Sequence, residues 1–335
     1  MVLQSKNKLG VFMNSKILIT GGLGYIGSHI SHLLNDRAII IDNMSNSCLN
    51  FKNILPKAKI YVNDLNKKNL EEIFEMNEID SVIHMASLKS VPKSKINPLE
   101  YYENNVVSTL DLLKSMKTYK INKLIFSSSA TVYSEKNKCP FKEDDILEST
   151  NPYGNTKLVI ERLIDDFSIS NKNFKAISLR YFNPIGADTD AKLSDAPLGD
   201  PENLMPILIE NVKQDSVFSV YGNDYNTKDG TCIRDFIHVQ DLANGHIKAL
   251  NKINLIEGHE KINLGLGKGI SVLELIKIFE SIIGKRIKHK FVKRRDGDTE
   301  KSVANINKAL DLLNWKPKYD YKDMIKSAWD TTNFS

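Results

Sequence analysis

The sequence predicts an α/β fold, with a doubly wound parallel sheet and a smaller C-terminal α/β lobe. Over the first half of the chain, short apolar runs typical of buried strands alternate with amphipathic helical patterns. A glycine-rich segment follows the first of these runs, and polar residues follow several of the others. Because ligands bind beyond the carboxyl ends of the strands in such sheets, these residues are the first candidates for a site.

The first strand–helix–strand unit has the pattern of a dinucleotide-binding site. An apolar run leads into the glycine-rich segment 21–27, a helical pattern follows, and a second apolar run ends in Asp42. Gly21 permits a tight turn, Gly24 lets the backbone approach a pyrophosphate, and Gly27 lets the helix pack closely on the strand. Asp42 would bind a ribose 2′-hydroxyl and repel a 2′-phosphate. We therefore expect a Rossmann-type fold that binds NAD in preference to NADP.

The same alternation continues along the first half of the chain. Strands are expected at 16–20, 38–41, 59–63, 81–86, 123–126 and 176–180, and helices at 25–35, 66–76, 99–117 and from 152 onward. The glycine loop, Asp42, Asp64, Lys89 and Ser129 then lie at strand ends, where a ligand would bind. His84 lies within a strand, so we expect it to pack in the core and to have no catalytic role.

The pattern of elements changes after about residue 186. Residues 186–202 have the composition of a long loop, and shorter elements follow it. Helices are expected at 204–213, 241–252, 272–283, 308–313 and 322–331, and strands near 217–220 and 288–292. We expect an N-terminal extension over 1–14, an NAD-binding domain over 15–185 and a substrate-binding domain over 186–335. Some exchange of chain between the two lobes is expected.

The composition is that of a globular protein and disfavours several classes. Of 335 residues, 26% are charged and 41% hydrophobic, and the net charge of +5 includes no long basic block. Nucleic-acid binding is therefore not expected. No apolar run approaches the ~18 residues of a membrane span, and no signal peptide is recognisable. Cys48, Cys139 and Cys232 lack metal-binding spacing and are typical of reduced thiols, so we expect a cytoplasmic protein without a metal.

A tyrosine and a lysine four residues apart begin the helix expected from residue 152. Asn151 is a plausible N-cap, and Pro152 suits the first helical position. Residues four apart share a helix face, so Tyr153 and Lys157 would point into the same space. A nearby cation and the positive end of a helix both lower the pKa of a phenol, which would make Tyr153 a candidate base.

With the glycine loop, Ser129, Tyr153 and Lys157 in this order, the chain resembles the extended short-chain dehydrogenase/reductase family, and within it the UDP-hexose 4-epimerases. The matching stretches are 20–28, 98–105, 126–133, 179–184, 203–206, 221–225, 229–231, 234–239 and 294–298. So many stretches in one order make the resemblance far more specific than any single motif.

The resemblance implies an activity. Tyr153 would take the proton from the C4 hydroxyl of a UDP-hexose, with Ser129 hydrogen-bonding that oxygen, while hydride passes from C4 to NAD and returns to the other face. UDP-glucose and UDP-galactose would thereby interconvert through a 4-keto intermediate. Lys157 would hold the nicotinamide ribose and help to lower the pKa of Tyr153.

The resemblance also implies which residues bind each ligand. Around the cofactor it places Gly21, Gly24, Tyr25, Ile26, Gly27, Asp42, Asn43, Asp64, Leu65, Lys89, Asn104, Tyr153, Lys157 and Tyr181. Around the UDP-sugar it places Ser129, Asn183, Asn203, Leu204, Tyr221, Arg234, Arg295, Asp298 and Ser302. Arg234 and Arg295 match the family's diphosphate-binding positions, a task to which arginine is well suited. These residues also have simpler interpretations. Arg295 could be a solvated partner of Arg294, and Tyr221 could be a residue of the hydrophobic core.

Two other functions are the alternatives to epimerisation. A nucleotide-sugar 4,6-dehydratase of the same fold needs an Asp-Glu pair directly after the Ser/Thr, where this chain has Ala130 and Thr131. Neither of these side chains can move a proton at neutral pH. A non-enzymatic NAD-binding protein would be expected to lose Tyr153 or Lys157, and both are present.

Ser302 bears on which sugar is accepted. Members of the family restricted to plain hexoses tend to carry Tyr at the matching position, and those that accept N-acetylhexosamines carry Cys or Ser. A small side chain leaves room for the acetamido group at C2. We therefore expect activity on UDP-N-acetylglucosamine and UDP-N-acetylgalactosamine as well, and an enzyme mainly for these N-acetylated sugars is the alternative.

The two long helices, from about Leu99 and from Pro152, resemble the pair through which the family forms dimers. We therefore expect a homodimer held by a four-helix contact. Apolar residues on these helices also serve the core, so the sequence leaves the dimer as an expectation.

Overall fold

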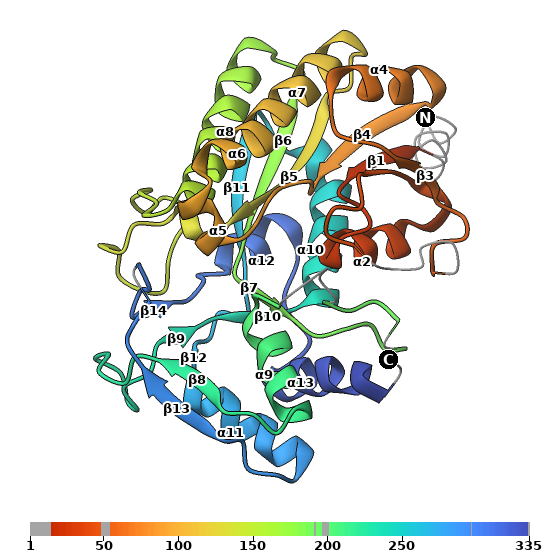
Figure 1. The fold of residues 1–335 in the computed structure, drawn as a ribbon. Coiled ribbons are helices and arrows are strands. Elements are labelled where there is room, and N and C mark those ends of the chain that lie inside the picture. The colour runs from red at the N-terminus through yellow and green to blue at the C-terminus, as the bar shows by residue number, and fades with distance from the viewer. Residues whose placement is uncertain (1–14, 48–53, 191, 196–200, 296, 334–335) are drawn as a thin grey trace.

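The computed structural model of the protein describes residues 15–47, 54–190, 192–195, 201–295 and 297–333. The extension expected over 1–14 and Cys48 lie outside this part of the chain. The described residues form a larger lobe around a central sheet and a smaller lobe beside it (Figure 1).

Seven parallel strands of the described chain form the sheet of the larger lobe. They are β1 (Lys16–Thr20), β2 (Ala38–Asp42), β3 (Lys59–Val62), β4 (Ile79–His84), β5 (Lys123–Ser129), β6 (Lys175–Tyr181) and β11 (His259–Leu264). Their order in the sheet is β11-β6-β5-β4-β1-β2-β3. The chain thus starts near the centre and winds outward in both directions, which confirms the predicted doubly wound fold.

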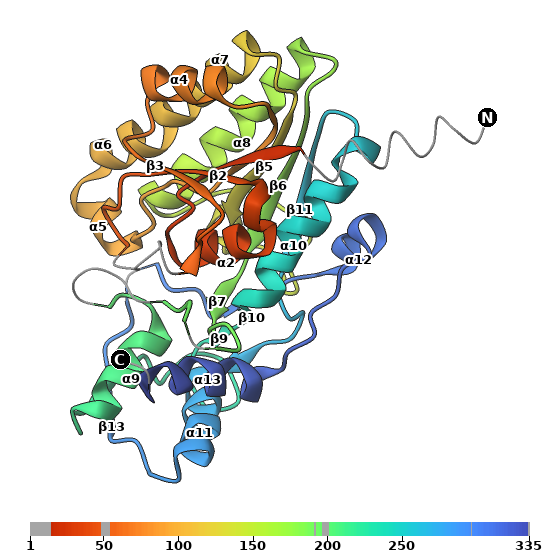
Figure 2. The same cartoon turned by 90° about the vertical axis from the view of Figure 1, so that its right-hand side faces the viewer.

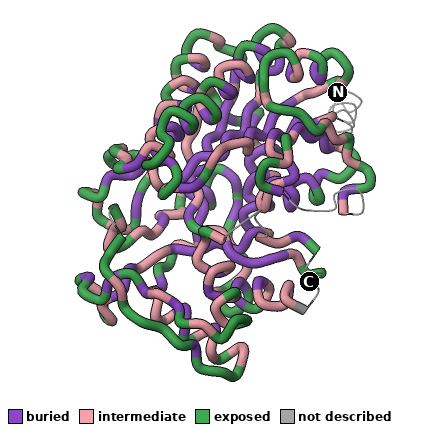
Figure 3. Tube along the Cα trace, in the orientation of Figure 1, coloured by how far each residue is buried: buried purple, intermediate pink, exposed green. Residues whose placement is uncertain are grey.

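Helices cover both faces of this sheet (Figure 2). Alternate side chains of β1 point to opposite faces, so Ile17 and Ile19 join one core and Leu18 the other. The first core is covered by α2 (Tyr25–Leu34), α10 (Val239–Lys252) and α12 (Asn307–Leu313), and the second by α4 (Lys67–Met76), α7 (Ser108–Thr118) and α8 (Pro152–Ser170). Figure 3 shows the buried backbone concentrated along the strands between these layers.

In the described residues, the smaller lobe is built from short strands and three helices. The strands are β7 (Asn183–Ile185) with β10 (Phe236–His238), β9 (Ile233–Arg234) between β12 (Ile270–Ser271) and β14 (Lys301–Ser302), and β8 (Phe218–Tyr221) with β13 (His289–Val292). The helices are α9 (Leu204–Lys213), α11 (Val272–Ile283) and α13 (Tyr321–Asp330). Their apolar faces, among them Leu208, Phe279 and Ile325, pack into one core. The division into domains at residue 185 stays a prediction.

Short elements connect these larger ones. They are α5 (Val91–Ile96), α6 (Pro98–Tyr101) and the 3-10 turns η1 (Asn35–Arg37), η3 (Ala130–Val132), η4 (Ile253–Leu255) and η5 (Thr331–Asn333).

The structure contains elements that were not predicted, among them the short α5, β7, β9, β10, β12 and β14, and two of the departures affect the larger lobe and the cavity. Strand β11 was not predicted, because its sequence contains few apolar residues and only Ile262 and Leu264 are strongly so. The helix expected over 99–117 consists of α6, a π-helical turn η2 (Tyr102–Val107) and α7. Such turns are rare and frequently lie at functional sites. Here Asn104 faces the cavity described below, and Asn105 is completely buried.

Candidate active site

Every residue that we expected to act in catalysis, cofactor binding or substrate binding lines one cavity, and elements of both lobes form its walls. The volume of this cavity is about 2130 Å³. Sites for one drug-sized ligand occupy roughly 300–1,000 Å³, so the cavity has room for two nucleotide-sized molecules. The role of each residue stays a prediction, but their convergence on one space does not depend on those roles.

The expected catalytic residues meet where β5 ends and α8 begins. Ser129 is the last residue of β5, and Tyr153 follows Pro152 in the first turn of α8. The side chain of Asn151 caps this helix by accepting a hydrogen bond from the Gly154 amide at 2.9 Å, as expected. The Lys157 ammonium lies 5.7 Å from the centre of the Tyr153 ring and donates to the Ser127 carbonyl at 2.8 Å.

Burial governs the protonation of both groups. It raises the pKa of Tyr153 to about 12, and the hydrogen bond with Ser129 lowers that pKa only in part. Burial also lowers the pKa of Lys157 to about 7. We expected the lysine and the helix terminus to lower the tyrosine pKa, and for the chain alone this expectation is wrong in direction. The physical reason is that loss of hydration disfavours a buried phenolate more than these neighbours favour it.

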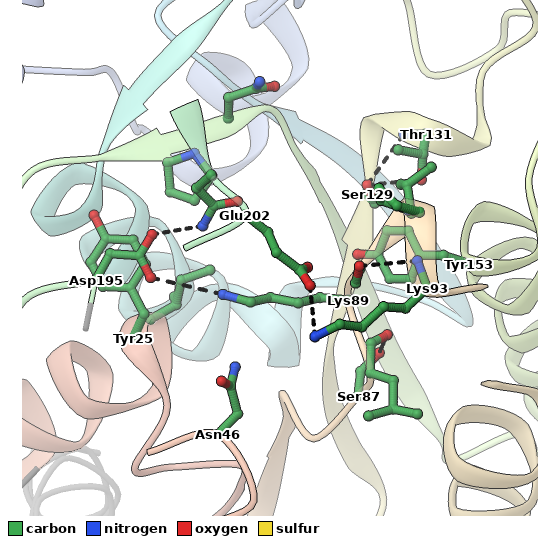
Figure 4. Close-up of a pocket in the computed structure, with 18 of the residues that line it drawn as sticks. Tyr25, Asn46, Ser87, Lys89, Lys93, Ser129, Thr131, Tyr153, Asp195 and Glu202 are labelled. Carbon is green, nitrogen blue, oxygen red and sulfur yellow. Dashed lines mark hydrogen bonds and ion pairs between the residues drawn. The ribbon is translucent and has the colours of Figure 1, made fainter. Parts of the chain in front are cut away.

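Thr131 orients the Ser129 hydroxyl. Both the amide and the hydroxyl of Thr131 donate to Ser129 Oγ, at 3.2 Å and 3.0 Å. A serine oxygen that accepts two hydrogen bonds has its own proton left to donate, and Tyr153 is its partner. Figure 4 shows Thr131, Ser129 and Tyr153 together on one wall of the cavity. The serine can therefore stabilise a phenolate.

The glycine loop has the shape that a dinucleotide needs. Gly21 has a φ of 68°, and a Cβ on Gly27 would lie 2.1 Å from the Gly21 carbonyl oxygen, so the turn and the close packing both require glycine. At Gly24 the nearest atom to an added Cβ is 3.5 Å away, so the space above this residue is open. Helix α2 begins there with no side-chain cap and no acidic residue in its first turn. Its amide groups are thus available to a pyrophosphate.

Asp42 is held in place at the end of β2. Its carboxylate accepts from the backbone amides of Leu23 and Met44, at 2.9 Å and 2.8 Å. Both bonds fix a negative charge at the cavity wall, where a ribose hydroxyl can donate to it and a 2′-phosphate is repelled. The residues of this wall therefore fit NAD.

The other residues expected around the cofactor have partners within the protein. Asn43 donates to Asp64 at 2.9 Å, and Tyr25 donates to the Gly186 carbonyl at 2.7 Å. The hydroxyl of Tyr181 is hydrogen-bonded to Ser127. Two further residues, Leu65 and Ile26, pack against the cores while lining the cavity.

On the side of the smaller lobe, the residues expected to bind the UDP-sugar form two contacting pairs. Arg234 forms an ion pair with Asp298 at 3.3 Å. The guanidinium of Arg295 stacks on the Tyr221 ring, with 3.9 Å between its Cζ atom and the centre of the ring. This contact argues against Tyr221 as a core residue, and 37% of its surface is exposed. A cation and an aromatic face thus lie together at the place where a diphosphate and a base were expected.

The comparisons with known proteins agree with this geometry. Residues 17–265 match the model of the NAD dependent epimerase/dehydratase family. The chain belongs to this family. It is 43% identical to UDP-glucose 4-epimerase of Dictyostelium discoideum over 95% of each chain. The resemblance to the extended short-chain dehydrogenase/reductase family is thereby confirmed.

Two solved structures of this epimerase/dehydratase family are similar over nearly the whole chain. UDP-glucose 4-epimerase from Stenotrophomonas maltophila, with bound NAD and formylated UDP-arabinopyranose, has a TM-score of 0.91 and 37% identity, covering 96% of this chain and 98% of that one. UDP-glucose 4-epimerase from Bifidobacterium longum, in complex with NAD+ and UDP, has a TM-score of 0.89 and 40% identity, covering 95% and 99%.

The structure shows further residues in the cavity that the sequence did not indicate. Asp195 and Glu202 point into the cavity towards Lys89 and Lys93, with ion-pair distances of 3.9 Å and 2.7 Å (Figure 4). Asn203 donates to Asp195 at 2.6 Å. The partners in each of these two ion pairs are more than 100 residues apart in the sequence, so no local sequence pattern indicates that they pair. Thr131 could have been recognised, because a threonine two residues after a strand-end serine can form such a local hydrogen bond.

Two features are absent from the part of the chain that the structure describes. No group of three or more His, Cys, Asp or Glu side chains is placed to hold a metal ion. No helix there is both long enough and apolar enough to cross a membrane.

Proposed function

We propose that the protein is an NAD-dependent UDP-hexose 4-epimerase that interconverts UDP-glucose and UDP-galactose and also accepts the N-acetylated pair. One observation carries the proposal. The Ser129, Tyr153 and Lys157 side chains line the same cavity as an NAD-shaped glycine loop and the Arg234 and Arg295 guanidinium groups. Full-length similarity to proteins named UDP-glucose 4-epimerase supports it.

The chain's own residues account for the proton chemistry. Tyr153, as the phenolate, accepts the proton of the sugar C4 hydroxyl and later returns it, and the hydrogen bond from Ser129 stabilises the phenolate before the first transfer and after the second. The Lys157 ammonium and the amides of the α2 N-terminus bind the cofactor's ribose and pyrophosphate. When bound, NAD supplies the acceptor for the C4 hydride and the donor that returns it.

The two ends of the substrate are held differently in this proposal. The Arg234 and Arg295 guanidinium groups bind the diphosphate, and the Tyr221 ring lies against the base. Near Tyr153 the wall offers the Ser129 hydroxyl as a hydrogen-bond partner for the sugar. A firmly held nucleotide and a loosely held sugar allow the 4-keto sugar to turn and receive hydride on either face.

A 4,6-dehydratase is the weaker candidate for this site. Ala130 and Thr131 form the 3-10 turn directly after Ser129, where that reaction requires an acid and a base. The Thr131 hydroxyl is already committed to Ser129. No observation favours a protein that binds NAD without catalysis.

The substrate range is tested by assaying the purified protein with both pairs of UDP-sugars. Ser302 lines the cavity at the end of β14, beside Arg234 on β9. We expect Ser302→Tyr to lower kcat/KM for the N-acetylated pair by at least about 10-fold, because a misfit of one methylene already has an effect of this size. The plain pair should be little affected.

Ser302→Ala is the matched control, since it keeps the side chain small and should retain activity on both pairs. Wild-type protein that converts only the plain pair, or a tyrosine variant with undiminished N-acetyl activity, would show that Ser302 does not set the range. Wild-type protein with bound NAD but no 4-epimerase activity would overturn the proposed function.

The homodimer is likewise a proposal. Large apolar side chains are exposed on α5, α6 and the π-helical turn, including Ile96 (76% exposed) and Leu99 (81%). These elements contact α8, so a partner could cover both. We expect Leu99→Glu to convert a dimer into a monomer in sedimentation at micromolar concentration. Leu255→Glu is the control, because Leu255 is 74% exposed but lies in η4, beside the opposite face of the sheet.

The cytoplasmic location stays a prediction. It is supported by Cys139 and Cys232, which are free thiols.

A further inference from the structure

A continuous chain of buried side chains joins the glycine loop to the catalytic helix behind the cavity. Its members are Thr20, His84, Thr109, Asn105 and Thr156, each at most 1% exposed. They come from β1, β4, α7, the π-helical turn and α8, respectively. Polar groups buried this completely are costly unless all of their hydrogen bonds are made, so the pattern of bonds can be worked out.

At the Thr20 end, this chain of side chains holds the loop that follows β4. The Ala86 amide donates to Thr20 Oγ1 at 3.1 Å, and the Met85 amide is shared between this oxygen, at 3.1 Å, and the Thr20 carbonyl oxygen, at 3.0 Å. With both lone pairs of this oxygen occupied, the Thr20 hydroxyl must donate its proton onward. Its partner is His84 Nδ1, at 2.7 Å. His84 Nδ1 is therefore an acceptor and carries no proton.

The opposite end leads independently to the same assignment. The Thr109 hydroxyl donates to the backbone carbonyl of Asn105 at 2.6 Å. It therefore has no proton left for His84 Nε2, which lies 2.8 Å away, and must accept from it. His84 is thus the neutral tautomer with its proton on Nε2, and burial lowers its pKa to about 3.

Asn105 connects this chain to both sides of the site. Its side-chain amide accepts from the Leu88 amide at 2.8 Å and donates to the Leu88 carbonyl at 3.1 Å, which clamps the backbone next to Lys89. The same amide donates to Thr156 Oγ1 at 3.1 Å. Thr156 in turn donates to the Tyr153 carbonyl at 2.7 Å. Every donor of the chain is used once, and all the bonds run in one consistent set of directions.

We infer that His84, Thr109 and Asn105 are positioning residues that hold the cofactor-binding loops in register with the helix that carries Tyr153 and Lys157. Thr20 directly precedes Gly21, and Leu88 directly precedes Lys89, so the chain ends at the backbone of both loops. It touches none of Tyr221, Arg234 or Arg295 on the UDP side. The inference deepens the proposed function and rests on it wherever turnover is the readout.

The tautomer of His84 is tested in the wild-type protein, with one variant used only to assign its signal. Nitrogen-15 NMR of histidine-labelled protein distinguishes protonated from unprotonated ring nitrogens, and loss of one signal in His84→Gln assigns the residue. We expect a proton on Nε2 and none on Nδ1 at neutral pH. A His84 with its proton on Nδ1, or a rapid mixture of the two forms, would overturn the inference, whatever the protein's activity.

The positioning role is tested with Thr109→Val, which removes the hydroxyl at nearly constant volume. We expect kcat to fall about 10- to 100-fold, because small displacements of reacting groups have effects of this size. KM for the UDP-sugar should stay within about twofold of the wild type, since the chain does not touch that side. The rise in melting temperature on adding NAD should shrink, and His84 should become a mixture of tautomers.

Two variants on the same helix complete the experiment. Thr109→Ser keeps the hydroxyl and should restore kcat, the NAD-induced shift and the single tautomer. Thr118→Val makes the same change where the hydroxyl is exposed and donates only to the Lys114 carbonyl, and it should behave as wild type. A Thr109→Val protein with a lower melting temperature but unchanged kcat and NAD-induced shift would reduce the chain to a structural role. If Thr109→Val does not fold, the wild-type tautomer and the Thr109→Ser rescue decide the inference.

Discussion

Tyr153→Phe should abolish nearly all epimerase turnover while leaving NAD binding intact. The variant removes only the phenol oxygen, and a positioned acid–base group contributes about 10²- to 10⁴-fold to a rate. We therefore expect kcat to fall by at least about 100-fold. NAD content of the purified protein and its melting temperature should be close to wild type, because the ring still fills its place in the wall. Turnover of UDP-galactose and bound-cofactor content measure the two effects separately.

Tyr61→Phe is a suitable control, since it removes a tyrosine hydroxyl from β3 that accepts only from Asn77 and does not line the cavity. It should leave kcat unchanged. A Tyr153→Phe enzyme with more than a tenth of wild-type turnover would exclude this tyrosine as the group that moves the C4 proton. An inactive variant that has also lost NAD would leave binding, not proton transfer, as its defect.

Arg180→Met should lower the free energy of unfolding by about 3–5 kcal/mol, the usual cost of leaving one partner of a buried ion pair alone. Arg180 on β6 and Glu161 on α8 are 1% and 2% exposed and form two hydrogen bonds, at 2.9 Å and 2.6 Å. Glu161 also accepts from Ser128 at 2.6 Å. The charge left on Glu161 would lie one helical turn from Lys157. Urea unfolding followed by circular dichroism measures the change.

An exposed ion pair provides the control. Lys326 and Asp330 are four residues apart on α13 at 2.6 Å, and Lys326→Ala should cost only about 0.3–0.5 kcal/mol. The double change Glu161→Leu with Arg180→Met should be less damaging than Arg180→Met alone, because it removes the unpaired carboxylate. If the two single effects simply add, the buried pair is not coupled and the explanation is wrong.

Elements with a strong local pattern could be predicted from the sequence. Strands β1 and β2 are continuous apolar runs, and α8 begins with a recognisable Asn151-Pro152 cap, so both kinds of element were placed correctly. The π-helical turn was missed because an amphipathic pattern does not reveal a single wide turn. Strand β11 was missed because it owes its place to pairing with β6, about 80 residues earlier in the chain.

The site was predictable where a motif lies at a strand end, and less so where two lobes meet. The glycine loop follows β1, and Asp42 and Ser129 are the last residues of β2 and β5, so the same sheet brings all three to one edge. Which side chains pair across the cavity depends on distances that no motif encodes, as with Lys89 and Asp195. The prediction that the Tyr153 pKa is lowered was wrong for a related reason, since the burial of a side chain cannot be measured from residues 151–157 alone.

The edge strand β11 has a consequence for how the chain is made. Residues 259–264 pair with β6, and His259 bonds both Ser178 and Asp165, so the central sheet is completed by a segment from the last quarter of the chain. Helices α10 and α12 cover one face of that sheet and also come late. A nascent chain that has left the ribosome only as far as residue 185 would have one apolar face of the sheet covered by α2 alone, and an open parallel edge at β6. Such a chain has no complete domain to fold, so it depends on the rest of its own synthesis, or on a chaperone, to avoid aggregation.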